Sequence, residues 1–283
     1  MCGRYAAAVD PDDLVEIFEV EVAALDRPTR SVLKSPQQPA PGSPDYNMAP
    51  TKAAPVVLAR PNDEQAPDDA ARELVALRQL RLLTWGLVPS WSKDPSTGVR
   101  MINARAETLL DKPAYRRAAA ARRCLVPADG WYEWQPSPVA KDGRGRPRKQ
   151  PFYLCRDDEQ PLAMAGVYEF WKDPDLASDD PQAWLVSFAV VTTTAEPGLD
   201  RIHPRQPVVL DPPDWAAWLD PAQTDSRHVS QLLSPHAPGR FRAWPVSTAV
   251  NSARNSGAEL LRPLPEQDLV GVVDPDTGEV LGG

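Results

Sequence analysis

Among the residues of this chain, Cys2 could carry the most distinctive combination of reactive groups. Once Met1 is removed, Cys2 carries a free α-amine and a thiol on adjacent carbons. In ordinary peptides the amine titrates at about 8 and the thiol at about 8.5, so each has a reactive form at neutral pH. An amine condenses with an aldehyde to an imine, and a neighbouring thiol then closes a five-membered thiazolidine ring. The alternative is a chance Met-Cys start with an inert thiol.

Two other residues could move protons near neutral pH. His203 follows a predicted strand, and a histidine at a strand end suits acid–base chemistry; a histidine in a surface turn is the alternative. Glu133 lies in an aromatic run in which Trp131 and Glu133 share one strand face. Burial on that face would raise the pKa of the carboxyl group, unless Glu133 lies on an edge strand and points to solvent.

Binding groups are found in two further segments. Asn103 and Arg105 alternate along the chain and so could face one site, where Asn can hold a carbonyl oxygen and Arg a phosphate. This string of residues is common and carries little information alone. Trp91 follows a proline in a polar setting and is a candidate for stacking on a base, whereas Trp85 fits the core.

Length, charge and cysteine content limit the class of protein. The 283 residues can bury a core as one large domain or two small ones. A net charge of -8 argues against a protein that coats nucleic acid with a basic surface all round, but it allows a local basic groove. The three cysteines form no CxxC pair, so we expect no disulfide framework, no metal and no cofactor. With neither a signal-peptide pattern nor a bilayer-length apolar run, we expect a soluble cytoplasmic protein without membrane contact.

Short strands separated by proline-rich loops are predicted for most of the chain. Strands are expected at 3–8, 55–59, 80–84, 151–155, 162–170 and 184–193, and helices at 10–25, 111–123, 211–219 and 226–233. Residues 27–45, 62–71 and 135–150 are predicted to be loops, the last one basic and mobile. This pattern predicts a single α+β domain around a curved, largely antiparallel β-sheet or open barrel with a few short flanking helices. The domain is expected to span 1–270 (2–270 after Met1 removal), with 271–283 as a flexible tail.

Seven segments together resemble the SOS-response-associated peptidase family, which includes proteins that crosslink themselves to abasic sites in DNA. They occur in the family's order and cover nearly the whole chain, as Met1–Arg4, Tyr46–Thr51, Trp85–Trp91, Ile102–Thr108, Arg123–Trp134, Ile202–Arg205 and Val250–Ser252. Each segment alone would be a weak signal.

The resemblance implies a catalytic set. Cys2, freed of Met1, would attack the C1′ aldehyde of a ring-opened abasic sugar. Asn103 would position the N-terminus and the sugar, and Glu133 would shuttle protons during imine and thiazolidine formation, Met1 removal and crosslink reversal. His203 would assist opening of the sugar ring.

The resemblance also implies DNA-binding positions. Arg4 and Arg105 match positions that hold phosphates beside the lesion, and Trp91 matches an aromatic position that stacks against the DNA. Asn47 and Pro50 would shape the pocket.

The chain departs from the family pattern at several places. Pro204 and Gln206 stand where the family often has an acidic residue and a methionine, and Ser92 stands where some relatives have a second aromatic residue. The loops 27–45, 62–71 and 135–150 resemble insertions, and the basic one could add phosphate contacts.

We therefore expect a DNA-damage (SOS) response protein that captures abasic sites in single-stranded DNA through a Cys2 thiazolidine. It would remove its own Met1, show some lyase activity, act as a monomer, and lie at the nucleoid when bound to DNA. One alternative is a cysteine peptidase acting on proteins, with Cys2 as nucleophile and His203 as base. Another is a non-covalent single-stranded DNA-binding module.

Overall fold

A closed five-stranded barrel forms the centre of the molecule. The computed structural model describes residues 2–26, 30–61, 76–180, 182–234 and 237–282. The barrel strands follow one another in the order β11 (Trp184–Thr194), β10 (Leu162–Lys172), β7 (Arg123–Ala128), β4 (Ala53–Pro61) and β5 (Ala76–Trp85). A parallel β5–β11 pairing closes this ring, so the barrel is closed rather than open. The predicted α+β fold around a curved, largely antiparallel sheet is confirmed.

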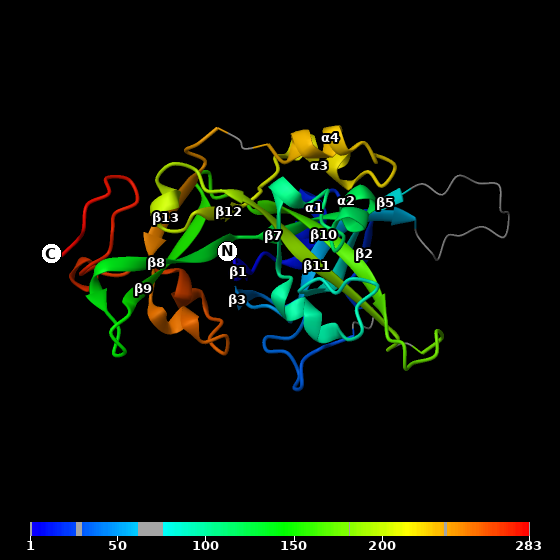
Figure 1. Cartoon of the computed structure of the whole chain (residues 1–283), viewed down its shortest axis with the longest axis horizontal. Coiled ribbons are helices and arrows are strands. Elements are labelled where there is room, and N and C mark those ends of the chain that lie inside the picture. Colours follow the sequence, from blue (N-terminus) through cyan, green and yellow to red (C-terminus); the bar gives the residue numbers. More distant parts are fainter. Residues whose placement is uncertain (1, 27–29, 62–75, 181, 235–236, 283) are drawn as a thin grey trace.

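A second sheet of five strands lies beside the barrel and carries the N-terminal strand (Figure 1). Its order is β13 (Phe241–Pro245), β9 (Pro147–Arg156), β8 (Gly130–Lys141), β1 (Arg4–Ala7) and β3 (Asp45–Met48). Three short strands extend the barrel sheet, namely β2 (Val22–Ala24), β6 (Asn103–Arg105) and β12 (Arg205–Pro207). Because β6 and β12 both pair with β11, they bring two distant segments to one end of that strand.

Four short α-helices flank the sheets. They are α1 (Pro11–Ile17), α2 (Arg116–Ala121), α3 (Pro212–Leu219) and α4 (Ser226–Leu232). The Asp10 side chain caps α1 as predicted, and Pro11 occupies its first turn, where a missing N–H costs nothing. Short 3₁₀ segments lie at Pro95–Arg100, Ala106–Thr108, Leu199–Arg201, Thr248–Asn251, Ala258–Leu261 and Glu266–Asp268.

The helix predicted over 111–123 is shorter than expected. Only Arg116–Ala121 is α-helical, and Arg123 already begins β7. Arg123 is buried, and its guanidinium donates to carbonyls that end α2 and α3, among them Ala119 O at 2.7 Å and Trp218 O at 2.6 Å. A cation at these C-termini complements the helix dipoles, so Arg123 fastens both helices to the barrel.

The basic segment 135–150 is a β-hairpin, so the prediction of a mobile loop there was wrong. Strands β8 and β9 pair from Trp131↔Leu154 to Lys141↔Pro147. The inner face of the hairpin contacts residues 271–282, which we had expected to be a flexible tail. Gln135 Nε2 donates to Val273 O at 2.9 Å and Ser137 Oγ to Gly271 O at 2.5 Å. The predicted loop 62–71 lies outside the described residues.

One apolar core combines alternate residues of all five barrel strands with residues of the second sheet. Cys2, Tyr5, Trp85, Trp131 and Phe188 all belong to it and are fully buried. The N-terminal strand therefore begins inside the molecule, not on its surface.

Candidate functional site

The Cys2 thiol is enclosed by protein at the start of β1. The side chain has no exposed surface, and Sγ lies 3.7 Å from Arg4 O. Burial raises the pKa of the thiol well above its ordinary value, and the nearby charge of Glu133 raises it further. At neutral pH the group is a thiol rather than a thiolate, so it needs a base to become a nucleophile.

Glu133 lies beside the N-terminal strand on β8. The pairing Arg4↔Tyr132 sets the register that brings it there. Trp131 and Glu133 share the inner face, as predicted, and Glu133 is only 3% exposed. Burial raises the pKa of its carboxyl group to about 7, because the charged form loses its hydration. Glu133 can thus both give and take a proton near neutral pH.

His203 faces Glu133 from the turn that precedes β12. Its Nδ1 lies 3.8 Å from Glu133 Oε2 and 3.1 Å from the Arg205 backbone nitrogen, which can donate to it. Nδ1 also lies 3.1 Å from Arg205 O, to which it can donate when it carries the proton, so both tautomers of the neutral ring find a partner in the Arg205 backbone. Burial lowers the pKa of His203, and the charges of Lys149 and Arg205 lower it further. The imidazole is therefore neutral at physiological pH.

Asn103 reaches the same site from β6. Its Nδ2 donates to Cys2 O at 2.8 Å. Its Oδ1 is buried and has no hydrogen-bond partner within the described part of the chain. The hydroxyl of Tyr115 donates to Asn103 O at 3.1 Å and the pairing Val190↔Asn103 fixes the strand. A buried amide oxygen without a partner at this point can accept a hydrogen bond from an incoming ligand or amine.

The contacts and charges thus bring Cys2, Asn103, Glu133 and His203 together from four separate elements. These are the segment that precedes β1, strands β6 and β8, and the turn before β12. Their catalytic roles stay predictions.

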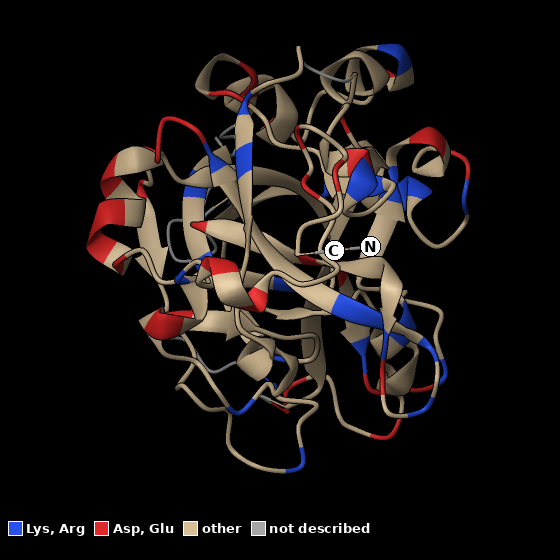
Figure 2. Cartoon of the chain, turned by 90° about the vertical axis from the view of Figure 1, so that its left-hand side faces the viewer, with Lys and Arg blue, Asp and Glu red and all other residues tan. Residues whose placement is uncertain are grey.

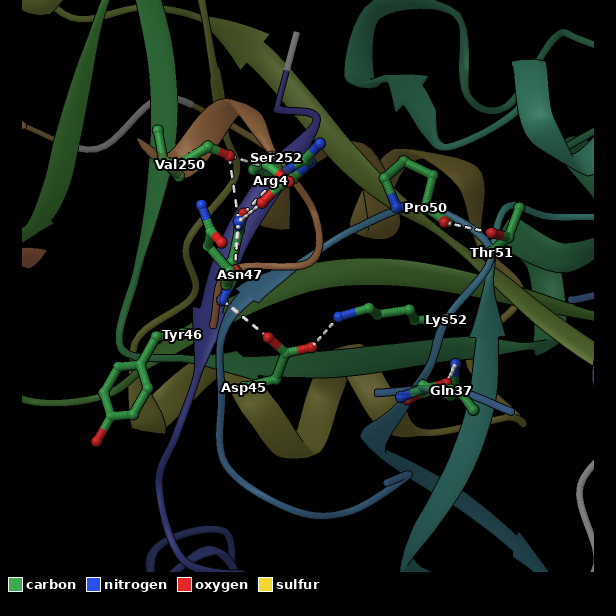
Figure 3. A network of polar contacts seen from close by, with 12 residues as sticks. Arg4, Gln37, Asp45, Tyr46, Asn47, Pro50, Thr51, Lys52, Val250 and Ser252 are labelled. Carbon is green, nitrogen blue, oxygen red and sulfur yellow. Dashed lines mark hydrogen bonds and ion pairs between the residues drawn. The ribbon is translucent and has the colours of Figure 1, made fainter. Parts of the chain in front are cut away.

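Arg4 and Asn47 form a polar clamp behind the N-terminal strand (Figure 3). Arg4 Nη1 donates to Asn47 Oδ1 at 2.8 Å and to Val250 O at 2.9 Å. The Asn47 side chain is fully buried, and its Nδ2 donates to three carbonyls of the 250–255 turn, Val250 O, Ser252 O and Asn255 O. In this structure both predicted DNA-binding side chains tie the turn to β1 and β3.

A buried ion pair supports the clamp from the other side of β3. Lys52 Nζ donates to Asp45 Oδ2 at 2.5 Å, and the Asp45 Oδ1 accepts from the Asn47 backbone nitrogen at 2.9 Å (Figure 3). In the turn that precedes Lys52, the Pro50 carbonyl accepts a hydrogen bond from the Thr51 hydroxyl. Thr51 has a φ of 74°, which is strained for a β-branched residue. Pro50 thus lies in a tightly held turn beside the clamp.

Arg105 and Trp91 lie on the surface. Arg105 is exposed at the end of β6, and no hydrogen bond or ion pair joins its side chain to another described residue. Trp91 is 65% exposed, and its loop is held by Trp171 Nε1, which donates to Ser92 O at 2.8 Å. Both side chains are available to a ligand, and nothing in the described residues places them in the catalytic set.

Sequence reasoning assigned no role to two cations beside His203. Arg205 donates bidentately to Glu107, at 2.5 and 3.0 Å, and to Thr192 O. Lys149 is exposed on β9. Arg205 belongs to the segment 202–205, from which only His203 was selected. Lys149 belongs to the basic run that was predicted to be a loop. Its position near His203 depends on the pairing of β8 with β9, which the sequence pattern does not show.

Among the described residues, no group of three or more His, Cys, Asp and Glu side chains is arranged to hold a metal ion. No helix in the described ranges is long and apolar enough to cross a membrane.

Comparison with known proteins gives a consistent result. A family profile described as SOS response associated peptidase (SRAP) matches residues 1–253. The chain is 31% identical over 262 residues to the abasic site processing protein YoqW of Bacillus subtilis (strain 168), covering 92% of this chain and 99% of that one. It is 30% identical over 292 residues to the abasic site processing protein HMCES of Rattus norvegicus, covering 93% and 76%.

Solved structures agree on the fold. A protein from Bacteroides thetaiotaomicron superposes with a TM-score of 0.64 at 21% identity, covering 93% of this chain and all of that one. A phage-related protein from Bordetella bronchiseptica superposes with a TM-score of 0.57 at 29% identity, covering 87% and 94%.

Proposed function

Because the chain belongs to the SOS response associated peptidase family, we propose that it processes abasic sites in DNA by forming a thiazolidine through Cys2. The observation that carries this proposal is the position of Cys2 beside Glu133, His203 and Asn103. The names of the relatives point to the same lesion. The form bound would be single-stranded DNA, and the protein would act as a monomer in the cytoplasm, at the nucleoid when bound.

The reaction begins once Met1 is removed and the Cys2 α-amine is free. The amine nitrogen attacks C1′ of the ring-opened sugar and forms a carbinolamine. Departure of the hydroxyl as water, with a proton supplied by Glu133, leaves a protonated imine (an iminium ion). The thiol sulfur then adds to the iminium carbon and its proton passes to the Glu133 carboxylate, which gives the neutral thiazolidine. One water is released in total, and Glu133 ends in the state in which it began.

Glu133 suits both steps because its pKa of about 7 makes each protonation state accessible at neutral pH. The base is required because burial keeps Cys2 as a neutral thiol. The neutral His203 ring, in the tautomer that carries its proton on Nε2, would donate to the ring oxygen of the closed sugar as the ring opens. Asn103 holds Cys2 by its carbonyl, which fixes the direction of the amine.

The buried thiol disfavours a peptidase acting on proteins in trans. A thiol protease needs a thiolate, which a neighbouring cation or histidine stabilises. Here burial and the Glu133 carboxylate both raise the pKa of the Cys2 thiol, and His203 faces Glu133. Attack by the amine, by contrast, needs no thiolate in its first step.

Replacement of Cys2 tests the proposal directly. Wild-type protein should form a denaturation-resistant adduct with single-stranded DNA that carries one abasic site, visible as a shifted band in a denaturing gel. Cys2→Ala should abolish the adduct. Cys2→Ala and Cys2→Ser both keep the α-amine once Met1 is removed, so each should give only an imine, which borohydride traps. An adduct of normal yield from Cys2→Ala would exclude the proposed chemistry.

A further inference from the structure

The β8–β9 hairpin concentrates positive charge in an acidic protein. Residues 136–150 contain five basic residues and one acidic residue, in a chain whose net charge is -8. Arg146 is paired with Asp142, and Arg148 donates to Val270 O. The remaining three cations, Lys141, Arg144 and Lys149, are exposed, and no hydrogen bond or ion pair joins their side chains to other described residues.

The outer face of the hairpin, which is the face opposite to Glu133, begins beside the N-terminal strand. Tyr132 pairs with Arg4, so the next outward residue of β8, Trp134, lies beside the start of the N-terminal strand. Pro136 and Lys149 follow as the next outward pair on the two strands. Glu133 pairs with Phe152 of β9, and Lys149 precedes Phe152 by three residues. At the usual rise per residue this separates Lys149 from Phe152 by about 10 Å along the strand. Figure 2 shows Lys and Arg segments both above and below the N-terminal end.

Aromatic, proline and cationic side chains alternate along this face. Trp134 is partly exposed and is held by its Nε1, which donates to Asn251 Oδ1 at 2.7 Å. Pro136 is exposed, and Lys149 lies beside it. Lys141 and Arg144 follow at the tip, roughly 25 Å from Glu133. Flat rings that accept stacked bases, interleaved with cations, are typical of surfaces that bind single-stranded nucleic acid.

The hairpin is also held in place from its inner face. Gln135 accepts from the Val273 backbone nitrogen at 2.8 Å, and Ser137 donates to Gly271 O at 2.5 Å. These bonds fix the outward side chains before any ligand arrives, which lowers the entropy lost on binding.

We propose that the outer face of the β8–β9 hairpin, from Trp134 through Pro136 and Lys149 to Lys141 and Arg144, binds the single strand that flanks the lesion on one side. The strand then runs from the Cys2 site along the hairpin over several nucleotides. This inference rests on the proposed function for the identity of the ligand. It adds a binding surface whose effect is measurable without any covalent step.

Salt dependence of DNA binding tests the surface. The triple variant Lys141→Gln/Arg144→Gln/Lys149→Gln and the wild type are compared by fluorescence anisotropy with a labelled, lesion-free single-stranded oligonucleotide over a range of salt concentrations. The slope of log affinity against log salt should fall in magnitude by about 2, since each phosphate contact on a single strand contributes about 0.7. Lys149→Gln alone should lower it by about 0.7.

A charge-matched control removes three exposed arginines on the helices, as Arg116→Gln/Arg117→Gln/Arg227→Gln. Its slope should equal that of the wild type. Equal slopes for the hairpin variant and the wild type, or an equal loss in the control, would overturn the inference.

An abasic oligonucleotide with one long flank gives the direction of the strand. Crosslinking by the wild type should be faster when the long flank lies on one particular side of the lesion, and the hairpin variant should lose this preference. Wild-type rates that do not depend on the side would contradict the inference. Cys2→Ala keeps the hairpin, so a wild-type salt slope in that variant separates failure of the crosslinking chemistry from failure of the surface.

Discussion

Glu133 is the residue to which we assign proton transfer in the proposed reaction. Its carboxyl group has a pKa of about 7 in the folded protein against an ordinary value of 4.5, because it is buried. Below about pH 4.5 the group is protonated in both the folded and the unfolded chain. As the pH rises toward 7 only the unfolded chain releases the proton, so the folded state progressively loses stability.

Glu133→Gln removes this titration. The unfolding free energy of the variant relative to the wild type should therefore rise by about 3 kcal/mol between about pH 4 and about pH 8. The crosslinking rate should fall by about 10²-fold or more, because the proton shuttle is lost. Urea denaturation at several pH values and a crosslinking time course measure the two effects.

Glu107→Gln is the matched control for this prediction. A hydrogen bond from Arg205 lowers the pKa of Glu107, so the wild-type residue stabilises the fold as the pH rises, and the variant should show a trend of the opposite sign. If Glu133→Gln shows no pH-dependent gain in stability, or crosslinks at the wild-type rate, the role assigned to Glu133 is wrong.

The sequence identified the residues that could do chemistry, but it did not show that they lie close together in the fold. The special chemistry of Cys2 follows from its position in the chain, and the buried face of Glu133 follows from the alternation with Trp131. The contact between Asn103 and Cys2 joins residues 101 positions apart, and no local pattern encodes it. The resemblance to a family supplied that grouping.

The N-terminal strand β1 depends for its position on the clamp formed by Asn47 and Arg4. Asn47→Ala would remove the hydrogen bonds of Asn47 to three turn carbonyls and to Arg4, and only the bond between Arg4 and Val250 O would remain of those that join Val250 O to the clamp. Loss of a buried, multiply bonded polar group costs about 2 to 4 kcal/mol of unfolding free energy. We expect a cooperative unfolding transition at lower temperature, measured by calorimetry.

Asn255→Ala serves as the comparison within the same turn. Its side chain is exposed and donates only to Ala249 O, so the loss should stay within about 1 kcal/mol. Similar losses from the two variants would show that the clamp contributes little to the position of β1.

Element prediction succeeded where local signals were strong. The cap and proline of α1, the aromatic residues of α3 and the strands β10 and β11 were predicted near their observed positions. The helix predicted over 10–25 was too long, because α1 ends at Ile17 and Val22–Ala24 forms β2. The prediction was also wrong for residues 135–150 of β8 and β9, because glycine, proline and lysine suppress strand propensity in a hairpin. Pairing with a neighbouring strand and with residues 271–282 overrides that propensity.

The whole molecule encloses its site between two sheets. Neither the closure of the barrel through β5 and β11 nor the second sheet could be read from periodicity, because strand order is set by contacts between distant segments. Closure matters for function since β11 carries β6 and β12 at one end. The residues on these strands then meet the N-terminus.

The mass of the adduct tests the central claim most directly. Purified protein is incubated with a single-stranded oligonucleotide that carries one abasic site, and the product is weighed intact and then digested and sequenced by mass spectrometry. The account predicts the mass of the chain without Met1 plus the DNA minus one water, with the modification at Cys2. An adduct that retains Met1, that maps to another residue, or that does not form would contradict it.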